Sequence, residues 1–376
     1  MRNLVALVVL SVLLSGCDRA QKVVALAMPI ATTKNSSANG KIVINPQFES
    51  ASNFSDGLAA VLVGGKWGYV DKQGKMVIKA QFNAARGFID GRAAVRTSND
   101  DAGKWGYINK QGTMVVEPRF DETHEFNEGF AAVCIGDYST GKWGYIDKHG
   151  TMIIKLQFDA TYGFYDGLAA VQIEDDLYGT GNWGYIDKQG AMVIDPQFGF
   201  TGGFSNGLAA VRIGDNKTGK WGYIDKQGKM VINPQFDDAF RFNDGLAAVR
   251  IGDNKTGKWG YIDKQGKMVI SPQFAYTSGF NDGLVAARTH EYWFWTGKLG
   301  YIDTQGTMVV EPRFDETREF NEGFAAVRIG DYLTGKWGYI DKQGKIVIAP
   351  QFDNTYRFDD GLAAVLIGGK WGYISR

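Results

Sequence analysis

Aspartate recurs at one fixed place in a repeated motif, and this set of equivalent carboxylates could do chemistry. The motif reads Lys-Trp-Gly-Tyr-Ile-Asp in its commonest form and precedes Lys-Gln-Gly. Its aspartates are Asp71, Asp147, Asp187, Asp225, Asp263, Asp303 and Asp341, with Asn109 in one further copy. A ring of carboxylates would bind cations or amines, whereas a short acceptor beside a turn commonly accepts backbone N–H groups. We expect the turn role, and a cation-binding ring is the alternative.

No other group of residues points to catalysis. The three histidines, His124, His149 and His290, have no metal-ligand spacing, and the first two replace Arg318 and Gln343 of sister copies, which indicates surface positions. The sequence has no Gly-x-Ser-x-Gly elbow, Walker loop or dinucleotide fingerprint. Catalysis needs one convergent set of groups, and a repeat supplies the same group many times. We therefore predict a protein that is not an enzyme and uses no cofactor and no metal.

Four consecutive aromatic residues mark the least repetitive segment. Tyr292, Trp293, Phe294 and Trp295 lie in the sequence THEYWFWTGK, where other copies read GDNKTG. Aromatic side chains exposed on a loop are typical of recognition surfaces, so these four are the candidate partner-binding residues. The alternative is that the rings fill the space left where Leu299 replaces the usual tryptophan.

The two cysteines have different contexts. Residues 1–17 read MRNLVALVVLSVLLSGC, and their apolar stretch is too short to span a bilayer but fits a signal peptide. The ending Leu-Ser-Gly-Cys resembles the lipobox of bacterial lipoproteins, which implies cleavage before Cys17 and acylation of that residue. A buried helix or a short uncleaved anchor is the alternative. Cys134 stands where sister copies carry Arg or Gln, which predicts an exposed free thiol.

The lipobox resemblance also predicts a location. Several acyl chains give stable membrane anchoring, so we expect a lipoprotein of the bacterial cell envelope. Asp18 resembles the residue that favours retention at the inner membrane, which places the protein on the periplasmic face of that membrane if the source is Gram-negative. Residues 18–40 end in a Ser/Asn/Gly-rich cluster and are predicted to form a linker.

Three sequence elements each occur nine times between residues 41 and 376. The dipeptide Trp-Gly has its Trp at 67, 105, 143, 183, 221, 259, 337 and 371, and Leu299-Gly300 fills the one gap. Variants of GLAAV and of KMVINPQF recur with the same period. The sequence therefore predicts an array of about nine repeats, of which the first and last are partial.

Each repeat is predicted to form antiparallel strands. In one copy, Lys220–Asp225 and Met230–Ile232 are joined by a Lys-Gln-Gly turn, and Leu208–Ile213 precedes them. Pro234 is expected to stop the third strand from continuing as a central member of the sheet, and Phe236 with Phe240 or Phe242 to form a short fourth strand or loop over its edge. The Ala-Ala pair indicates the innermost strand of a radial array. Gly222 is expected to leave space for a ring of the neighbouring sheet.

The ends of the array indicate closure. It begins with a third strand at Lys41–Phe48 and ends after a second strand at Trp371–Ile374, so the two ends complete one unit. Strands from both termini share one blade in β-propellers. We predict an all-β fold of nine three-to-four-stranded antiparallel units that close into a propeller-like ring. Because propellers usually have four to eight blades, an open β-solenoid or superhelix is the alternative.

Over residues 41–376 these motifs resemble the bacterial WG-repeat (KWG-repeat) family. KWGYIDKQGKMVI, PQF and FxxGLAAV carry the resemblance, while Leu299, Ala80, Leu156 and the segment 289–298 depart from it. The resemblance implies an all-β repeat domain without an established biochemical activity.

Composition excludes several classes of protein. The 376 residues include 50 Gly, and 41 Lys plus Arg balance 41 Asp plus Glu. Because nucleic-acid binding relies on concentrated positive charge, we expect no nucleic-acid partner. The 13% of aromatic residues argues against disorder.

Two functional hypotheses remain. The first is a non-catalytic, lipid-anchored scaffold of the cell envelope that binds an unidentified envelope protein. The alternative is a carbohydrate or cell-wall binding module, because Trp-Tyr hairpins resemble choline-binding repeats and aromatic faces stack on sugar rings. Burial of the repeat tryptophans would distinguish them, since a ring packed between sheets cannot stack on a sugar.

Overall fold

The computed structural model describes residues 40–98, 103–137, 140–173, 182–215, 218–288 and 297–376. These residues form strands, turns and loops. They include no helix long and apolar enough to cross a membrane. Cys17 and the four aromatic residues Tyr292 to Trp295 lie outside the described part of the chain.

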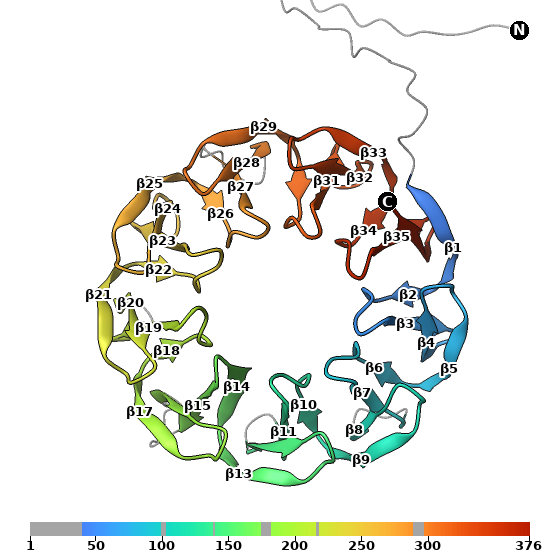
Figure 1. Ribbon diagram of the computed structural model, residues 1–376, viewed down its shortest axis with the longest axis horizontal. Coiled ribbons are helices and arrows are strands. Elements are labelled where there is room, and N and C mark those ends of the chain that lie inside the picture. Colours follow the sequence, from blue (N-terminus) through green and yellow to red (C-terminus); the bar gives the residue numbers. More distant parts are fainter. Residues whose placement is uncertain (1–39, 99–102, 138–139, 174–181, 216–217, 289–296) are drawn as a thin grey trace, which may run out of the picture. The chain divides into compact units, whose positions relative to one another are not determined.

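The described residues form nine four-stranded antiparallel sheets arranged as the blades of a closed ring (Figure 1). Blades 1 to 3, each from the axis outward, comprise β2(Ser50–Ala51), β3(Leu58–Val63), β4(Lys66–Asp71), β5(Met76–Phe82); β6(Ala84–Ala85), β7(Ala93–Arg96), β8(Trp105–Ile108), β9(Met114–Phe120); β10(Glu122–Thr123), β11(Phe130–Ile135), β12(Lys142–Asp147), β13(Met152–Phe158).

Blades 4 to 6 repeat this order with β14(Ala160–Tyr165), β15(Leu168–Ile173), β16(Asn182–Ile186), β17(Met192–Phe198); β18(Phe200–Thr201), β19(Leu208–Ile213), β20(Lys220–Asp225), β21(Met230–Phe236); β22(Asp238–Ala239), β23(Ala247–Ile251), β24(Lys258–Ile262), β25(Met268–Phe274). Blades 7 and 8 comprise β26(Tyr276–Thr277), β27(Leu284–Arg288), β28(Leu299–Asp303), β29(Met308–Phe314); β30(Glu316–Thr317), β31(Phe324–Ile329), β32(Lys336–Asp341), β33(Ile346–Phe352).

Blade 9 joins both ends of the described chain. Its inner strands are β34(Asn354–Thr355), β35(Leu362–Ile367) and β36(Lys370–Ser375), and its outermost strand is β1(Lys41–Phe48). In this sheet Lys41 pairs with Ser375 and Phe48 with Trp371. The prediction of a closed ring fastened by strands from both ends is confirmed, and the open solenoid is excluded.

Three local predictions were wrong. The Ala-Ala strand is the second from the axis, because a short strand, usually of two residues, lies inside it. Phe236 does not belong to a fourth strand: β21 runs through Pro234 to Phe236, and it is an outermost strand, which tolerates Pro because it has no outer neighbour. The space beside Gly222 is filled by its own blade, since a Cβ there would lie 2.4 Å from the carbonyl oxygen of Ile232.

The aspartates of the repeated motif have the predicted turn role. The Oδ1 atom of Asp225 accepts the backbone N–H groups of Gln227, at 3.0 Å, and Lys229, at 2.9 Å. Asn109 makes the same pair of contacts with Gln111 and Thr113. Each carboxylate is therefore directed into its own turn.

Identical contacts join every blade to the next. The tyrosine two residues after the repeat tryptophan, or after Leu299, is fully buried and donates its hydroxyl to a backbone carbonyl of the following blade. Its ring meets a phenylalanine of that blade at centroid distances of 4.7–5.0 Å. The closing contact is equivalent, because Tyr373 donates to the carbonyl of Ser52 at 2.7 Å and packs on Phe54. We call these nine contacts the seams.

Two further contacts hold the seams at the faces of the ring. On one face, in several blades, the lysine before the repeat tryptophan or Leu299 pairs with an acid that lies directly before the innermost strand of the next blade. Lys298 pairs in this way with Asp315 at 2.6 Å. On the other face, tight turns have positive φ at an acid or Asn and the following Gly. The carboxylate of Asp56 accepts the N–H of Gly91 in the next turn at 2.7 Å, and that of Asp360 closes the circle on Gly57 at 3.0 Å. The frame is thus repeated through the thickness of the ring.

Candidate functional site

The inner edges of the blades carry side chains that differ between repeats. The seam tyrosine is the same in all nine copies. One position does vary, namely the residue two places after the first residue of each innermost strand. It is Ser52, Arg86, His124, Tyr162, Gly202, Phe240, Ser278, Arg318 or Tyr356. We use the name inner wall for three sets of side chains: those at this third position, those of the first residue of each innermost strand, and those of the residues that lead from there to the tight turn. It is the surface on which blades of the same frame present different chemistry.

Inner-wall side chains lie on the repeat tryptophans of most blades. Tyr162 stacks on Trp183 with centroids 5.1 Å apart and an interplanar angle of 14°. Phe240 on Trp259 and Tyr356 on Trp371 make stacks of 4.8 and 4.9 Å. In other blades an arginine lies over the tryptophan, as Arg318 does over Trp337 at 4.8 Å. The repeat tryptophans are buried or half-buried, so the surface offered to a ligand is that of their covers.

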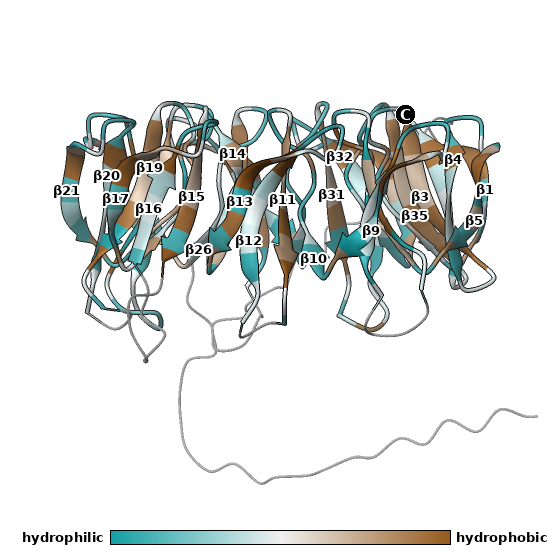
Figure 2. Ribbon diagram, turned by 90° about the horizontal axis from the view of Figure 1, so that it is seen from below, coloured by the Kyte–Doolittle hydropathy of each residue, from teal (hydrophilic) through white to brown (hydrophobic). Residues whose placement is uncertain are grey.

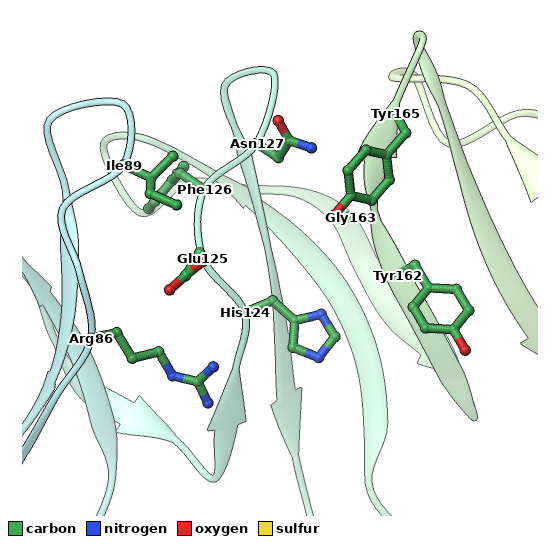
Figure 3. A pocket seen from close by; sticks show the side chains of 9 residues that line it. All are labelled: Arg86, Ile89, His124, Glu125, Phe126, Asn127, Tyr162, Gly163 and Tyr165. Carbon is green, nitrogen blue, oxygen red and sulfur yellow. The ribbon is translucent and has the colours of Figure 1, made fainter. Parts of the chain in front are cut away.

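The described part of the wall contains a pocket of about 450 Å³ across blades 2 to 4 (Figure 3). Its lining residues are Arg86, Ile89, His124, Glu125, Phe126, Asn127, Tyr162, Gly163 and Tyr165. They come from the inner hairpins of three successive blades, so neither one repeat nor one seam makes the site. Its volume is within the range of small-molecule sites in proteins.

The charges in this pocket are largely paired. The Arg86 guanidinium lies 2.7 Å from a carboxylate oxygen of Glu122 and stacks over Trp105. His124 lies against Trp143 with ring centroids 4.7 Å apart. Burial and, to a lesser extent, the charge of Arg86 lower the pKa of His124, so its imidazole is neutral at neutral pH. The pocket therefore offers aromatic faces, neutral hydrogen-bonding groups and the Glu125 carboxylate beside one paired cation.

A second wall pocket, of about 410 Å³, lies across blades 7, 8, 9 and 1. It is lined by Tyr276, Arg318 and Tyr356 together with Asn53 and Arg357, among other residues. Tyr276 is 47% exposed. Aromatic and arginine side chains thus recur on another part of the wall.

The loops between second and third strands gather on one face of the ring, which we call the loop face (Figure 2). Tyr332 and Leu333 in the loop of blade 8 are 81% and 88% exposed. Asp331 holds this loop by accepting the N–H groups of Leu333 and Thr334. In blade 7 the segment with the predicted aromatic residues joins β27 to β28. Leu299, which begins β28, is itself buried.

Two predictions of exposure were wrong. Cys134 is only 5% exposed, and burial raises the pKa of its thiol. Its place was expected to be exposed because sister copies carry Arg, but these arginines lie over the repeat tryptophans, as Arg250 does at 5.6 Å. His124, expected on the open surface, is half-buried in the wall pocket.

The described residues include no group of three or more His, Cys, Asp or Glu side chains placed to hold a metal ion. The chemistry that the wall offers is binding through stacking and hydrogen bonds. Sequence reasoning missed the wall because it followed what the repeats share. The available signal was the set of positions at which otherwise near-identical repeats disagree.

Comparison with known proteins identifies the repeats. A family model described as "WG containing repeat" matches nine segments, residues 37–67, 67–99, 105–138, 143–178, 183–217, 221–255, 259–293, 300–332 and 337–371. No curated protein matches the chain.

Solved structures resemble the fold. One described as a eukaryotic initiation factor is 12% identical, with a TM-score of 0.59 over 90% of this chain and 93% of that one. The dipeptidyl peptidase 4 of Porphyromonas gingivalis is also 12% identical, with a TM-score of 0.51 over 85% of this chain and 65% of that one. At such identities the likeness shows a shared fold alone.

Proposed function

Because the chain belongs to the WG-repeat family and its repeats close into a nine-bladed propeller, we propose that it is a non-catalytic interaction scaffold. One observation carries this proposal. The seam residues are the same in every repeat, whereas exposed residues on the same backbone differ from blade to blade. A propeller with unlike side chains on one frame offers many binding surfaces, and this arrangement suits recognition. In this role the protein binds an envelope protein.

The loop face is the proposed surface for the protein partner. Tyr332 and Leu333 supply exposed apolar groups there, and aromatic anchors commonly dominate binding energy at protein interfaces. Tyr292, Trp293, Phe294 and Trp295 belong to the corresponding loop of the neighbouring blade and remain the candidate partner-binding residues.

A cross-linking experiment in the native envelope tests this surface. We expect one partner to be cross-linked to the wild-type chain and lost when the four aromatic residues, or Tyr332 and Leu333, are changed to Ser. The matched control is the blade 6 loop, with Asn254 and Lys255 changed to Ser, which should leave the cross-link intact. Equal cross-linking in all variants would reject the loop face as the binding surface.

Lipid attachment at Cys17 is proposed to place the propeller on the envelope membrane, on the periplasmic face of the inner membrane in a Gram-negative cell. The lipobox-like ending of residues 1–17 supports this. Cys17→Ala should abolish metabolic labelling with palmitate and release or misprocess the protein. A labelled Cys17→Ala protein would contradict the proposal.

The second candidate function is carbohydrate or cell-wall binding. It is favoured by the Tyr and Phe rings stacked on repeat tryptophans at the inner wall, because aromatic faces of this kind pack on sugar rings. The sugar-binding surface would then be the inner wall, and the tryptophans would support it from behind.

A further inference from the structure

Two departures from the repeat occur on the sides of the wall pocket. The residue before each tight turn is Ser or Asn in six blades, and in five of them its side chain is seen to donate to a phenylalanine carbonyl of the next blade. Ile89 in blade 2 and Tyr165 in blade 4 replace that donor, and both line the pocket. Asp359, the remaining exception, pairs with Arg357. Blades 2 and 4 have thus exchanged a polar contact between blades for apolar surface on either side of blade 3.

Tyr165 is held as a platform. The inner strand β14 has six residues, whereas the inner strands of the other blades have two, and Tyr165 at its end pairs with Leu168 of β15. Its ring lies against Gly203 of blade 5, where a Cβ would come within 2.7 Å of the ring. The side chain is nevertheless 38% exposed. One face of the ring is therefore supported while part of the ring is left open.

Tyr162 provides a second supported ring in the same hairpin. Its stack on Trp183 fixes the ring, and Gly163 next to it has no side chain. A Cβ at Gly163 would meet Tyr165 at 3.6 Å and the Cβ of Asn127 at 3.7 Å, so the glycine keeps this part of the pocket open. Both tyrosines line the pocket, as Figure 3 shows.

Polar groups surround these rings. Within the described structure, Glu125 has no ion pair or hydrogen bond, so its exposed carboxylate is free to accept hydroxyl groups. Asn127 donates its amide to the Phe164 carbonyl at 2.8 Å, which leaves its Oδ1 as an acceptor. His124 is a neutral group with one donor and one acceptor. Directed acceptors beside aromatic faces suit a ligand with hydroxyl groups and an apolar face.

We propose that this pocket binds a pyranose ring of a glycan, with Tyr165 and Tyr162 as its stacking surfaces and Glu125 and Asn127 as hydroxyl acceptors. The proposal deepens the second candidate function and rests on it. An anionic ligand fits less well, because Arg86 is already paired with Glu122.

Tyr165→Asn tests the site with a residue that the array itself uses at this position. We expect the variant to keep the melting temperature of wild type, since Asn127 and Asn243 occupy the same place in folded blades. Titration of the full chain with cellobiose, chitobiose and maltose, followed by calorimetry, should show binding of at least one sugar. Loss of one stacking ring should weaken that binding about tenfold.

Phe200→Ala is the matched control, because Phe200 is an exposed aromatic residue on the inner side of blade 5 and does not line this pocket. This variant should bind the sugar as wild type does. If sugar binding is unchanged in Tyr165→Asn, the site is wrong while glycan binding by the protein stands. If none of the three sugars binds, both the site and the second candidate function are rejected. Loss of the cross-linked partner in Tyr165→Asn, without sugar binding, would assign the pocket to a protein instead.

Discussion

The seams and the inner wall follow opposite rules within the same repeat. At every seam the same tyrosine is buried and donates to the next blade, including at the junction of the two chain ends. At the inner wall, by contrast, one and the same position of the repeat is Gly202 in one blade, Tyr162 in another and Arg86 in a third. The residues that close the ring are therefore separate from those that differ between blades.

Removing residues 371–376 should have the largest effect, because it takes away the strand that joins β1 to β35. Trp371, Tyr373 and Ile374 are all buried, and truncation of one large core side chain typically costs about 2–5 kcal/mol. We expect a loss of more than about 5 kcal/mol of unfolding free energy, measured by urea denaturation. Deleting Arg376 alone is the control. Fraying confined to blade 9, with the other blades unchanged by hydrogen exchange, would contradict a ring fastened at this strand.

The second-largest difference between the seam-bearing blade interior and the inner wall is expected for two glycine substitutions. Gly222→Ala would place a Cβ 2.4 Å from the Ile232 carbonyl, so the outer strand must move, and overpacking of this kind costs about 1–3 kcal/mol. Gly202→Ala on the wall meets no atom within 4 Å and should leave the unfolding free energy unchanged. Thermal and urea denaturation of both variants measures the difference. Equal losses would mean that the wall belongs to the frame.

Tyr223→Phe and Tyr373→Phe compare an internal seam with the closing seam. Each removes the hydroxyl donor to a partly buried backbone carbonyl, that of Phe240 in the first case and of Ser52 in the second, which should cost about 1–2 kcal/mol. Urea denaturation should give the same loss for both, because their geometries match. A much larger loss for Tyr373→Phe would show that closure strains the ninth seam.

A smaller, pH-dependent effect is expected at the edge of the seam. The Lys336 ammonium and the N–H of Gly368 hold the pKa of Asp353 below its usual range. A lowered pKa in the folded state stabilises the protein above the ordinary carboxyl pKa, and this contribution disappears as pH falls through the lowered value. Asp353→Asn should therefore lower the urea midpoint at about pH 7, and its difference from wild type should shrink as the pH falls below the ordinary carboxyl pKa. Asn83, which contacts Lys66, shows that the array accepts Asn at this place. A loss independent of pH would reject the charge as its cause.

The sequence alone was sufficient for the ring and insufficient for the site, for a physical reason. Strand order and turn carboxylates follow from residues close together in the chain, such as Asp225 and Gln227, and the shared blade follows from the incomplete units at the two ends of the array. The unbroken strand at Pro234 depends on the absence of a further strand outside β21 in the described sheet, and the burial of Cys134 depends on the side chains packed beside its strand. Neither can be read from residues close in sequence. The wall pocket joins Arg86, His124 and Tyr162, which lie 38 residues apart, and only the stacking of blades brings them together.

The smallest effect should come from Tyr276→Ser on the wall. Tyr276 is 47% exposed, the Arg288 guanidinium lies over its ring at 5.7 Å, and surface substitutions usually change stability by less than about 0.5 kcal/mol. Serine already occurs as Ser50, the first residue of the equivalent strand β2, so the backbone accepts it. Urea denaturation should therefore give the wild-type midpoint. A loss of about 2 kcal/mol would mean that wall side chains support the seams, and variation between blades would then reflect packing rather than recognition.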